Sequence, residues 1–264
     1  MKVIFLYLFT AHIIGDYYLQ DQYTADNKHH DEKLFYNHLL MYILPFAVFA
    51  VLLKFELNFI IASALAVLAH GVIDIGKRKL VKGKKKYKDS NIYVFDQALH
   101  ILSLIIIATV FRRTHLSFFG FIADFFYEFW VEPYQAAKWL LAFLLIYKPS
   151  NITFTVLFSQ FKPAEDKSII KENSIVDTEV SSEIAERSNL KAGGIIGVLE
   201  KTICLILMSL GEYAAVGLVL TAKSIARYDR ISKDPVFAEY YLIGTLSSII
   251  MVFMIYILCF QLLM

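Results

Sequence analysis

Long apolar segments separated by short polar stretches limit this chain to one class of fold. Residues with aliphatic, aromatic or thiol side chains make up 58% of the 264 residues, above the ~45–50% apolar usage of soluble domains. The segments are long enough for membrane helices and lack the short alternating pattern of a membrane β-barrel. We therefore expect an all-α, polytopic helical membrane protein with seven or eight transmembrane or re-entrant helices. The expected helices are about 3–20, 34–53, 57–76, 94–111, 195–210, 213–228 and 237–263. The stretch 116–157 is ambiguous: 116–133 could span the membrane or lie in its interface, and another apolar stretch follows at 136–147.

A change in composition divides the chain into three parts. Residues 1–158 form a first membrane module, and residues 192–264 form a second, consisting of a helical hairpin and a final helix. Between them, 159–191 is charged, rich in Ser and poor in aromatic residues, which is typical of a flexible linker. One short helix is expected within it, at 179–187.

Seven ionisable side chains interrupt the apolar segments of the first module. Such residues are rare inside membranes and are functional by default. They come from the stretches "AHIIGDYYLQ", "FYNHLLMY", "LAHGVIDIGK" and "FDQALH". The seven are His12, Asp16, His38, His70, Asp74, Asp96 and His100.

The positions of these seven residues along their helices predict that they meet. They lie near the end of the first helix, the start of the second, the end of the third and the start of the fourth, and successive spans alternate in direction. All seven therefore fall on one side of the membrane. Three pairs are also spaced i,i+4, which places both members on one helix face.

Imidazole and carboxylate groups held from several directions are the ligands of zinc or a similar divalent ion. We expect one or two such ions, with Gln20 and Gln97 contacting the ligands and Asp96 serving as general base. Two alternatives stay open. The residues could form a metal-free polar or proton-relay cluster, or simply bond the helices together.

Two resemblances bear on this site. The elements "HIIGDYYLQ", the isolated His38, "HGVID-GK" and "DQALH" resemble a family of bacterial membrane proteins, domain-of-unknown-function family 3307, over about residues 5–105. The C-terminal stretches "GVLEKTI", "GEYAAVG", "AKSIARY" and "EYYLIGT" resemble its longer members. More distantly, paired H-x3-D motifs are similar to membrane-bound metal-dependent hydrolases and the zinc-dependent phospholipase C group. That similarity implies a zinc site that hydrolyses phosphoesters, and it carries over to His12, Asp16, His70 and Asp74.

A basic stretch follows the third helix. Residues 77–88 hold eight Lys or Arg and no acid until Asp89, which places this side of the membrane in the cytoplasm. The resemblance implies a bacterial inner membrane, with the metal site near its cytoplasmic face. The stretch is either only a determinant of topology or also a site that gathers anionic lipid headgroups. The residues assigned to lipid or anion binding are Lys77, Arg78, Lys84, Lys85 and Lys86.

Charged residues also lie in the apolar segments of the second module. If 195–210 and 213–228 form a hairpin, Glu200 comes level with Lys223 and Arg227. We expect a structural ion pair there.

These features predict an intramembrane metal-dependent hydrolase acting at the cytoplasmic interface on a phospholipid or another phosphoester. The alternatives are a transporter or channel for metal ions or protons, and a non-catalytic membrane sensor or assembly partner. Membrane lipids are the expected partners, with a homo-oligomer and a protein docked on 159–191 left open. No nucleic-acid partner is expected.

Overall fold

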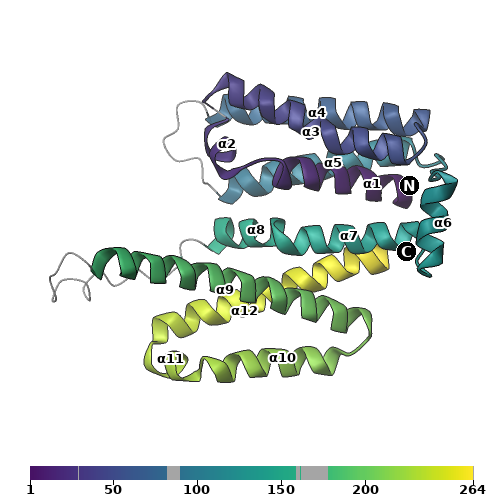
Figure 1. The fold of residues 1–264 in the computed structure, drawn as a ribbon. Coiled ribbons are helices and arrows are strands. Elements are labelled where there is room, and N and C mark those ends of the chain that lie inside the picture. Colours follow the sequence, from purple (N-terminus) through teal and green to yellow (C-terminus); the bar gives the residue numbers. More distant parts are fainter. Residues whose placement is uncertain (29, 82–89, 159–160, 162–177, 264) are drawn as a thin grey trace. The chain divides into compact units, whose positions relative to one another are not determined.

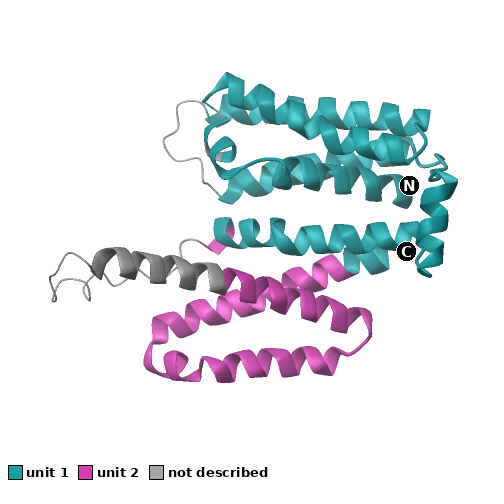
Figure 2. Ribbon diagram, in the orientation of Figure 1, with its two compact units in different colours: residues 1–156, 257–264 teal, residues 157–256 magenta. Residues whose placement is uncertain are grey.

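All regular structure in the described part of the chain is helical, and the helices divide into two units (Figures 1 and 2). The structure is a computed structural model that describes residues 1–28, 30–81, 90–158, 161 and 178–263, with side chains for all of these except 26 and 178–192. Unit 1 contains 1–156 and 257–264, and unit 2 contains 157–256. The predicted all-α class is confirmed.

Unit 1 is built around its first helix, α1, Lys2–Ile13, which packs against four other helices (Figure 1). Nine of the twelve residues of α1 are buried, because an apolar helix without a polar face is stable only when neighbours cover it on all sides. Its partners are α3 (Glu32–Leu52), α4 (Leu57–Val81), α5 (Ser90–Val110) and α7 (Pro133–Tyr147).

Shorter elements complete unit 1. A π-helical turn, η1 (Ile14–Tyr18), continues α1 directly. The remaining elements are α2 (Gln22–Asn27), α6 (Gly120–Glu128), α8 (Pro149–Phe158) and a second π-helical segment, η4 (Ile257–Leu262).

Two aspartates fix the segment between α1 and α3. Asp21 caps α2 by accepting a hydrogen bond from the Thr24 N–H at 2.7 Å, and hydrogen bonds from the Thr24 side chain and backbone lower the pKa of Asp21. Asp31 caps α3 through the N–H groups of Lys33 and Leu34. Caps of this kind satisfy the free donors at a helix start. They fix the residues at which α2 and α3 begin.

Five helices in the described part of the chain are long and apolar enough to cross a membrane. By length and composition, the chain is therefore a multi-pass membrane protein. Large apolar side chains on their outer faces, such as Leu68 and Val72, are well exposed, as expected for surfaces that face lipid. The five are Glu32–Leu52, Leu57–Val81, Ser90–Val110, Pro133–Phe158 and Pro235–Leu262. The count of seven or eight spans stays a prediction, because α1 and α10 are shorter.

The aromatic stretch 116–133 forms only the nine-residue helix α6, none of whose residues is buried. A helix of nine residues is too short to cross a bilayer of ~30 Å. Of the two predicted positions, the structure therefore favours the interface. The following span consists of α7 and α8, which meet at Lys148 and Pro149.

Unit 2 contains the hairpin expected near Glu212. Helix α9 (Thr178–Ser209) turns into α10 (Tyr213–Ala226) through Gly211, whose φ of +79° lies in the left-handed region that glycine adopts without strain. Helices α11 (Tyr228–Lys233) and α12 (Pro235–Tyr256) complete unit 2. Most of the predicted linker lies outside the described residues. Its last part, from residue 178 on, belongs to α9.

Candidate metal centre

Gly15 brings the first helix close enough to α3 for their polar residues to meet. A Cβ atom at Gly15 would lie 2.7 Å from Tyr42 Cδ2 and 3.2 Å from Tyr42 Cα, so no larger residue fits without a shift. The following residue, Asp16, lies in the π-helical turn η1. Such turns are rare and occur often at functional sites. In the sequence "GD", Gly15 therefore allows the close approach to α3 and Asp16 follows in the π-helical turn. The i,i+4 spacing alone does not reveal this arrangement.

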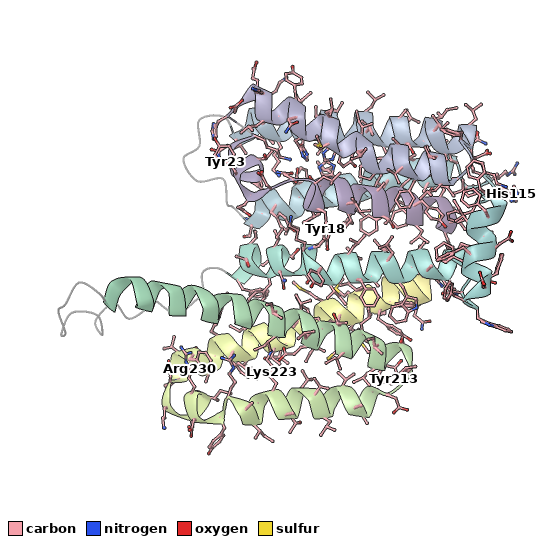
Figure 3. All side chains as sticks on the ribbon, viewed as in Figure 1. Tyr18, Tyr23, His115, Tyr213, Lys223 and Arg230 are labelled. Atoms are coloured by element: carbon pink, nitrogen blue, oxygen red, sulfur yellow. The ribbon has the colours of Figure 1, made fainter. Side chains whose placement is uncertain are left out.

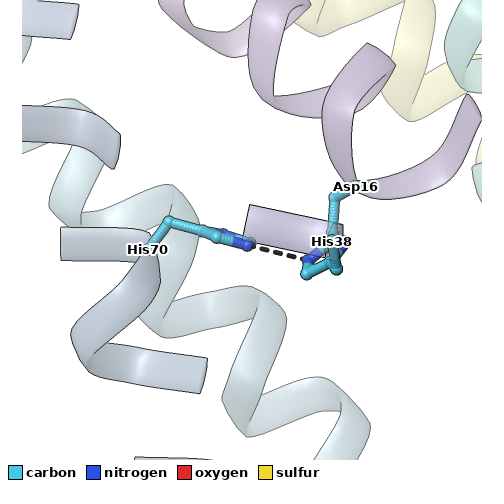
Figure 4. Close-up of side chains that lie close together, drawn as sticks. All are labelled: Asp16, His38 and His70. Atoms are coloured by element: carbon cyan, nitrogen blue, oxygen red, sulfur yellow. Dashed lines mark hydrogen bonds and ion pairs between the residues drawn. The ribbon is translucent and has the colours of Figure 1, made fainter. Parts of the chain in front are cut away.

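The first group of candidate ligands gathers around His38 Nε2. This atom lies 3.2 Å from His70 Nε2, 3.6 Å from Asp16 Oδ1 and 3.4 Å from Asp74 Oδ2. His70 Nε2 is in turn 3.7 Å from Asp74 Oδ2. Figure 4 shows the His38 and His70 side chains pointing toward one another beside Asp16. Two helices and the η1 turn thus contribute donors to one point.

The second group lies around His100 Nε2, which is 3.7 Å from Asp74 Oδ1 and 3.6 Å from Asp96 Oδ1. Both His100 Nε2 and Asp96 Oδ1 are buried and have no hydrogen-bond partner. Buried polar atoms are nearly always paired. Two adjacent orphaned atoms, one imidazole nitrogen and one carboxylate oxygen, are what a metal ion would satisfy.

Asp74 connects the two groups, because its Oδ2 faces His38 and His70 whereas its Oδ1 faces His100. Asp74 is only 1% exposed to solvent. Ligands about 2.0–2.1 Å from a tetrahedral zinc ion lie about 3.3–3.4 Å apart, close to the spacings in the first group. The donors therefore fit one ion at each group, with Asp74 between them.

His12 lies next to the two groups but belongs to neither. Its Nδ1 is 3.0 Å from the Tyr42 hydroxyl, and its ring centre is 5.4 Å from that of His100. The Nε2 atom of His12 is buried without a partner. The Tyr42 ring also stacks on His70 at 3.7 Å between centres. Tyr42, which no sequence pattern singles out, thus orients two of the predicted histidines.

The two predicted glutamines lie beside the candidate ligands. Gln97 Nε2 donates to Asp16 Oδ2 at 3.4 Å and to Asp96 Oδ2 at 3.3 Å. The Gln20 side-chain amide can donate to His38 Nδ1 at 3.2 Å when it is turned to accept from the Ala25 N–H. In the opposite orientation its oxygen accepts from Lys28 Nζ at 3.3 Å. The amide can therefore adapt to either tautomer of His38.

Two lysines offset the negative charge of the cluster. Lys28 Nζ lies 3.0 Å from Asp74 Oδ2 and 3.9 Å from Asp16 Oδ1, and the residue is 5% exposed. Lys77 Nζ lies 2.8 Å from Asp96 Oδ2. Nothing in the polar stretch around Lys28 distinguishes it from its solvated neighbours, so only the fold reveals it.

The ion pair with Asp96 gives Lys77 a partner other than the predicted lipid headgroup. Arg78 contacts Glu32 Oε1 at 3.4 Å and lies over the Phe35 ring. The three other predicted anion-binding lysines, Lys84, Lys85 and Lys86, lie outside the described residues. Lipid binding by this stretch stays a prediction.

A cavity of about 280 Å³ opens beside the cluster. Its polar wall includes Asp16, Asp74 and Asp96, together with Lys28 and Lys77. Three of the candidate ligands, all aspartates, therefore border a space large enough for a small ligand group. The cluster is open on this side, which distinguishes it from a closed structural site.

In unit 2, Lys223 Nζ lies 2.6 Å from Glu200 Oε2, so the pair expected to join α9 and α10 is present. Figure 3 labels Lys223 near the end of α10 and Tyr213 at its start. Arg227 is exposed at the end of α10 and forms no ion pair with Glu200 in the part of the chain described.

Comparisons with known proteins support only part of the predicted resemblance. Residues 4–126 match the model of a family described as "Protein of unknown function (DUF3307)". This segment contains all seven candidate ligands and both glutamines. No curated protein and no solved structure matches the chain. No named homologue therefore supports the similarity to hydrolases.

Proposed function

We propose that the chain is a membrane-embedded hydrolase that depends on a divalent metal ion, best zinc, and cleaves phosphoester bonds. The observation that carries the proposal is the two groups of His and Asp atoms at ligand spacing. Within them, Asp96 Oδ1 and His100 Nε2 are buried without a hydrogen-bond partner, as is Nε2 of the neighbouring His12. In a cluster held together by hydrogen bonds alone, such buried atoms would be expected to have hydrogen-bond partners. The nitrogen and oxygen donors are those that zinc prefers.

The cavity beside the cluster supports catalysis over a purely structural metal site. A bound divalent ion would lower the pKa of a coordinated water toward ~7 and polarise a phosphoryl oxygen. Hydrolysis adds the water oxygen to phosphorus, breaks the P–O bond to the alcohol, and delivers a proton to the leaving oxygen. Lys77 and Gln97 hold Asp96 through Oδ2. Its Oδ1 is therefore the oxygen free to coordinate the ion or to accept the water proton.

The location of the cluster also favours hydrolysis. Asp74 lies in the C-terminal half of α4 and Asp96 in the N-terminal half of α5, whereas His70 and His100 lie near the midpoints of these helices. Few polar residues lie between these histidines and the opposite ends of α4 and α5 to make a path across the membrane. The proposed position is the cytoplasmic interface of a bacterial inner membrane. The basic stretch 77–88 supports that orientation.

The test combines metal analysis with an activity assay. The protein, purified without chelators, should hold one or two ions and should hydrolyse p-nitrophenyl phosphate or bis-p-nitrophenyl phosphate until a chelator is added. His70→Ala should lower both metal content and rate, the rate by at least about a hundredfold. His115→Ala, which removes an exposed histidine outside the cluster, is the matched control.

Each alternative function has its own result. Bound metal without hydrolysis, together with metal uptake by vesicles that contain the protein, would favour a transporter. A protein without metal, or a His70→Ala variant that keeps full metal content and rate, would contradict the proposal.

A further inference from the structure

The cavity beside the metal cluster contains a lysine whose position inside a membrane span calls for a functional role. Lys148 lies between α7 and α8, within the candidate span Pro133–Phe158, and lines the cavity. A lysine at such a position is costly and marks a functional site by default. The helix is interrupted at this point, because Pro149 follows directly.

Lys148 differs from the two other lysines of the cavity in its partners. Its Nζ donates to two backbone carbonyl oxygens, those of Tyr17 at 2.5 Å and Gln20 at 3.3 Å. Lys28 and Lys77 are instead paired with aspartates of the cluster. Lys148 forms no ion pair with any described residue. Its Nζ also lies 5.7 Å from the centre of the Tyr18 ring. The positive charge is therefore fixed in place without a carboxylate at ion-pair distance among the described residues.

The charge of the cavity depends on the metal. Four carboxylates and three ammonium groups line it, so without metal its formal charge is negative. One divalent ion makes the charge positive, and the wall then favours an anion. The ammonium of Lys148 and the metal would bind such an anion from two sides, as in other sites for phosphoryl groups.

Part of the cavity wall is apolar, although α5 also contributes the polar side chains of Tyr93, Asp96 and Gln97 to the wall. Ile92 of α5 and Ile152 and Val156 of α8 line the apolar part, and the last two are spaced i,i+4 on one helix face. A cavity with charged groups on one side and branched aliphatic side chains on the other fits an amphiphilic ligand. A small hydrophilic phosphate would leave this apolar wall uncovered.

We infer that this cavity binds the phosphate group of an amphiphilic phosphoester, with Lys148 holding a phosphate oxygen and Ile152 and Val156 contacting the first part of the alkyl chain. The inference rests on the proposed function, because it needs the metal for its charge. It assigns a substrate class, a phosphate carried on an apolar chain, and it assigns Lys148 as the residue that selects the anion.

The experiment measures binding of two probes to the full chain in neutral detergent by calorimetry. The probes are inorganic phosphate and octylphosphonate, whose C–P bond resists hydrolysis. Octylphosphonate should bind at least about tenfold more tightly than phosphate, because its chain covers the apolar wall. Lys148→Met should weaken both probes by about tenfold or more, since it removes a charge-assisted hydrogen bond.

Four further variants separate the effect of the Lys148 charge from effects on folding and on contact with the alkyl chain. Lys79→Met removes an exposed lysine near the C-terminal end of α4 and should change neither affinity. Lys148→Arg keeps the charge and should stay within about threefold of the wild type. If Lys148→Met does not fold, Lys148→Gln, which keeps a donor for the carbonyls of Tyr17 and Gln20, takes its place. Ile152→Asn should weaken octylphosphonate and leave phosphate unchanged.

Metal content, measured on every sample, separates the two proposals. Metal-loaded protein that binds neither probe, or that binds both equally well after Lys148→Met, would overturn the phosphate site and leave the metal centre standing. Equal affinities for phosphate and octylphosphonate would overturn the amphiphilic substrate. Wild-type protein that holds no metal would overturn both the proposed function and this inference.

Discussion

Asp74 is the residue on which the candidate centre most depends. Its two oxygens face different histidines, and Oδ2 also accepts the Lys28 ammonium at 3.0 Å. Removing one partner from a buried charged pair is strongly destabilising, because the other charge is left uncompensated. A change at this residue should therefore affect both groups of ligands together.

Asp74→Asn keeps the size of the side chain and removes its charge. We expect metal content to fall below about a tenth of the wild-type value, because both ligand groups lose a carboxylate oxygen. Asp124→Asn, on the exposed side of α6, should leave metal content unchanged. Elemental analysis of both purified variants measures the difference. Full metal occupancy in Asp74→Asn would contradict the assignment of Asp74 as a shared ligand.

At the scale of elements, the close contact between η1 and α3 sets the position of Asp16. Gly15→Ala places a methyl group 2.7 Å from the Tyr42 ring. We expect a loss of about 1–3 kcal/mol in stability, as for other overpacked cores, and weaker metal binding. Thermal unfolding in detergent, with and without added metal, measures both effects.

Gly76→Ala is the matched control for that change. Gly76 is exposed on α4, and a Cβ there meets nothing within 4 Å. Alanine is the better helix former by roughly 0.5–1 kcal/mol, so this variant should be as stable as the wild type or slightly more stable. If Gly15→Ala behaved like Gly76→Ala, the close approach would not matter.

The hairpin of unit 2 depends on a different pair of charges. Glu200→Gln leaves Lys223 Nζ without its carboxylate partner at 2.6 Å. Polar pairs within membrane proteins contribute about 0.6–2 kcal/mol, so the unfolding midpoint should fall slightly. Metal content should not change, because all candidate ligands come from the first module. A loss of metal in Glu200→Gln would mean that unit 2 takes part in the centre.

At the scale of the whole molecule, the two ends of unit 1 should face different compartments. Tyr23, at the end nearer the candidate metal centre, and His115, at the other end, are labelled in Figure 3. In a Cys204→Ser, Cys259→Ser background, Tyr23→Cys should react with an impermeant maleimide only after the cells are opened. His115→Cys should react in intact, outer-membrane-permeabilised cells. The reverse pattern would place the site outside the cytoplasm.

Most residues of the candidate centre could be predicted from the sequence, because three His and Asp pairs in i,i+4 register within apolar helices place both members of each pair on one helix face. The order of helices and the break near Gly211 followed from the apolar segments. Lys28 and Tyr42 could not be predicted, since their roles depend on the path of α2 and on the contact of α3 with Gly15. The position of Lys148 in the cavity wall could not be predicted either, because its sequence context indicates only a broken helix.

The most direct test of the metal centre is an anomalous difference map from crystals of the metal-bound protein, collected on both sides of the absorption edge of zinc. We predict a peak between Asp16 Oδ1, His38 Nε2, His70 Nε2 and Asp74 Oδ2. When two ions are bound, a second peak should lie about 3.5–4 Å away, beside Asp74 Oδ1, Asp96 and His100. A map of zinc-replete protein without a peak among these side chains would contradict the central claim.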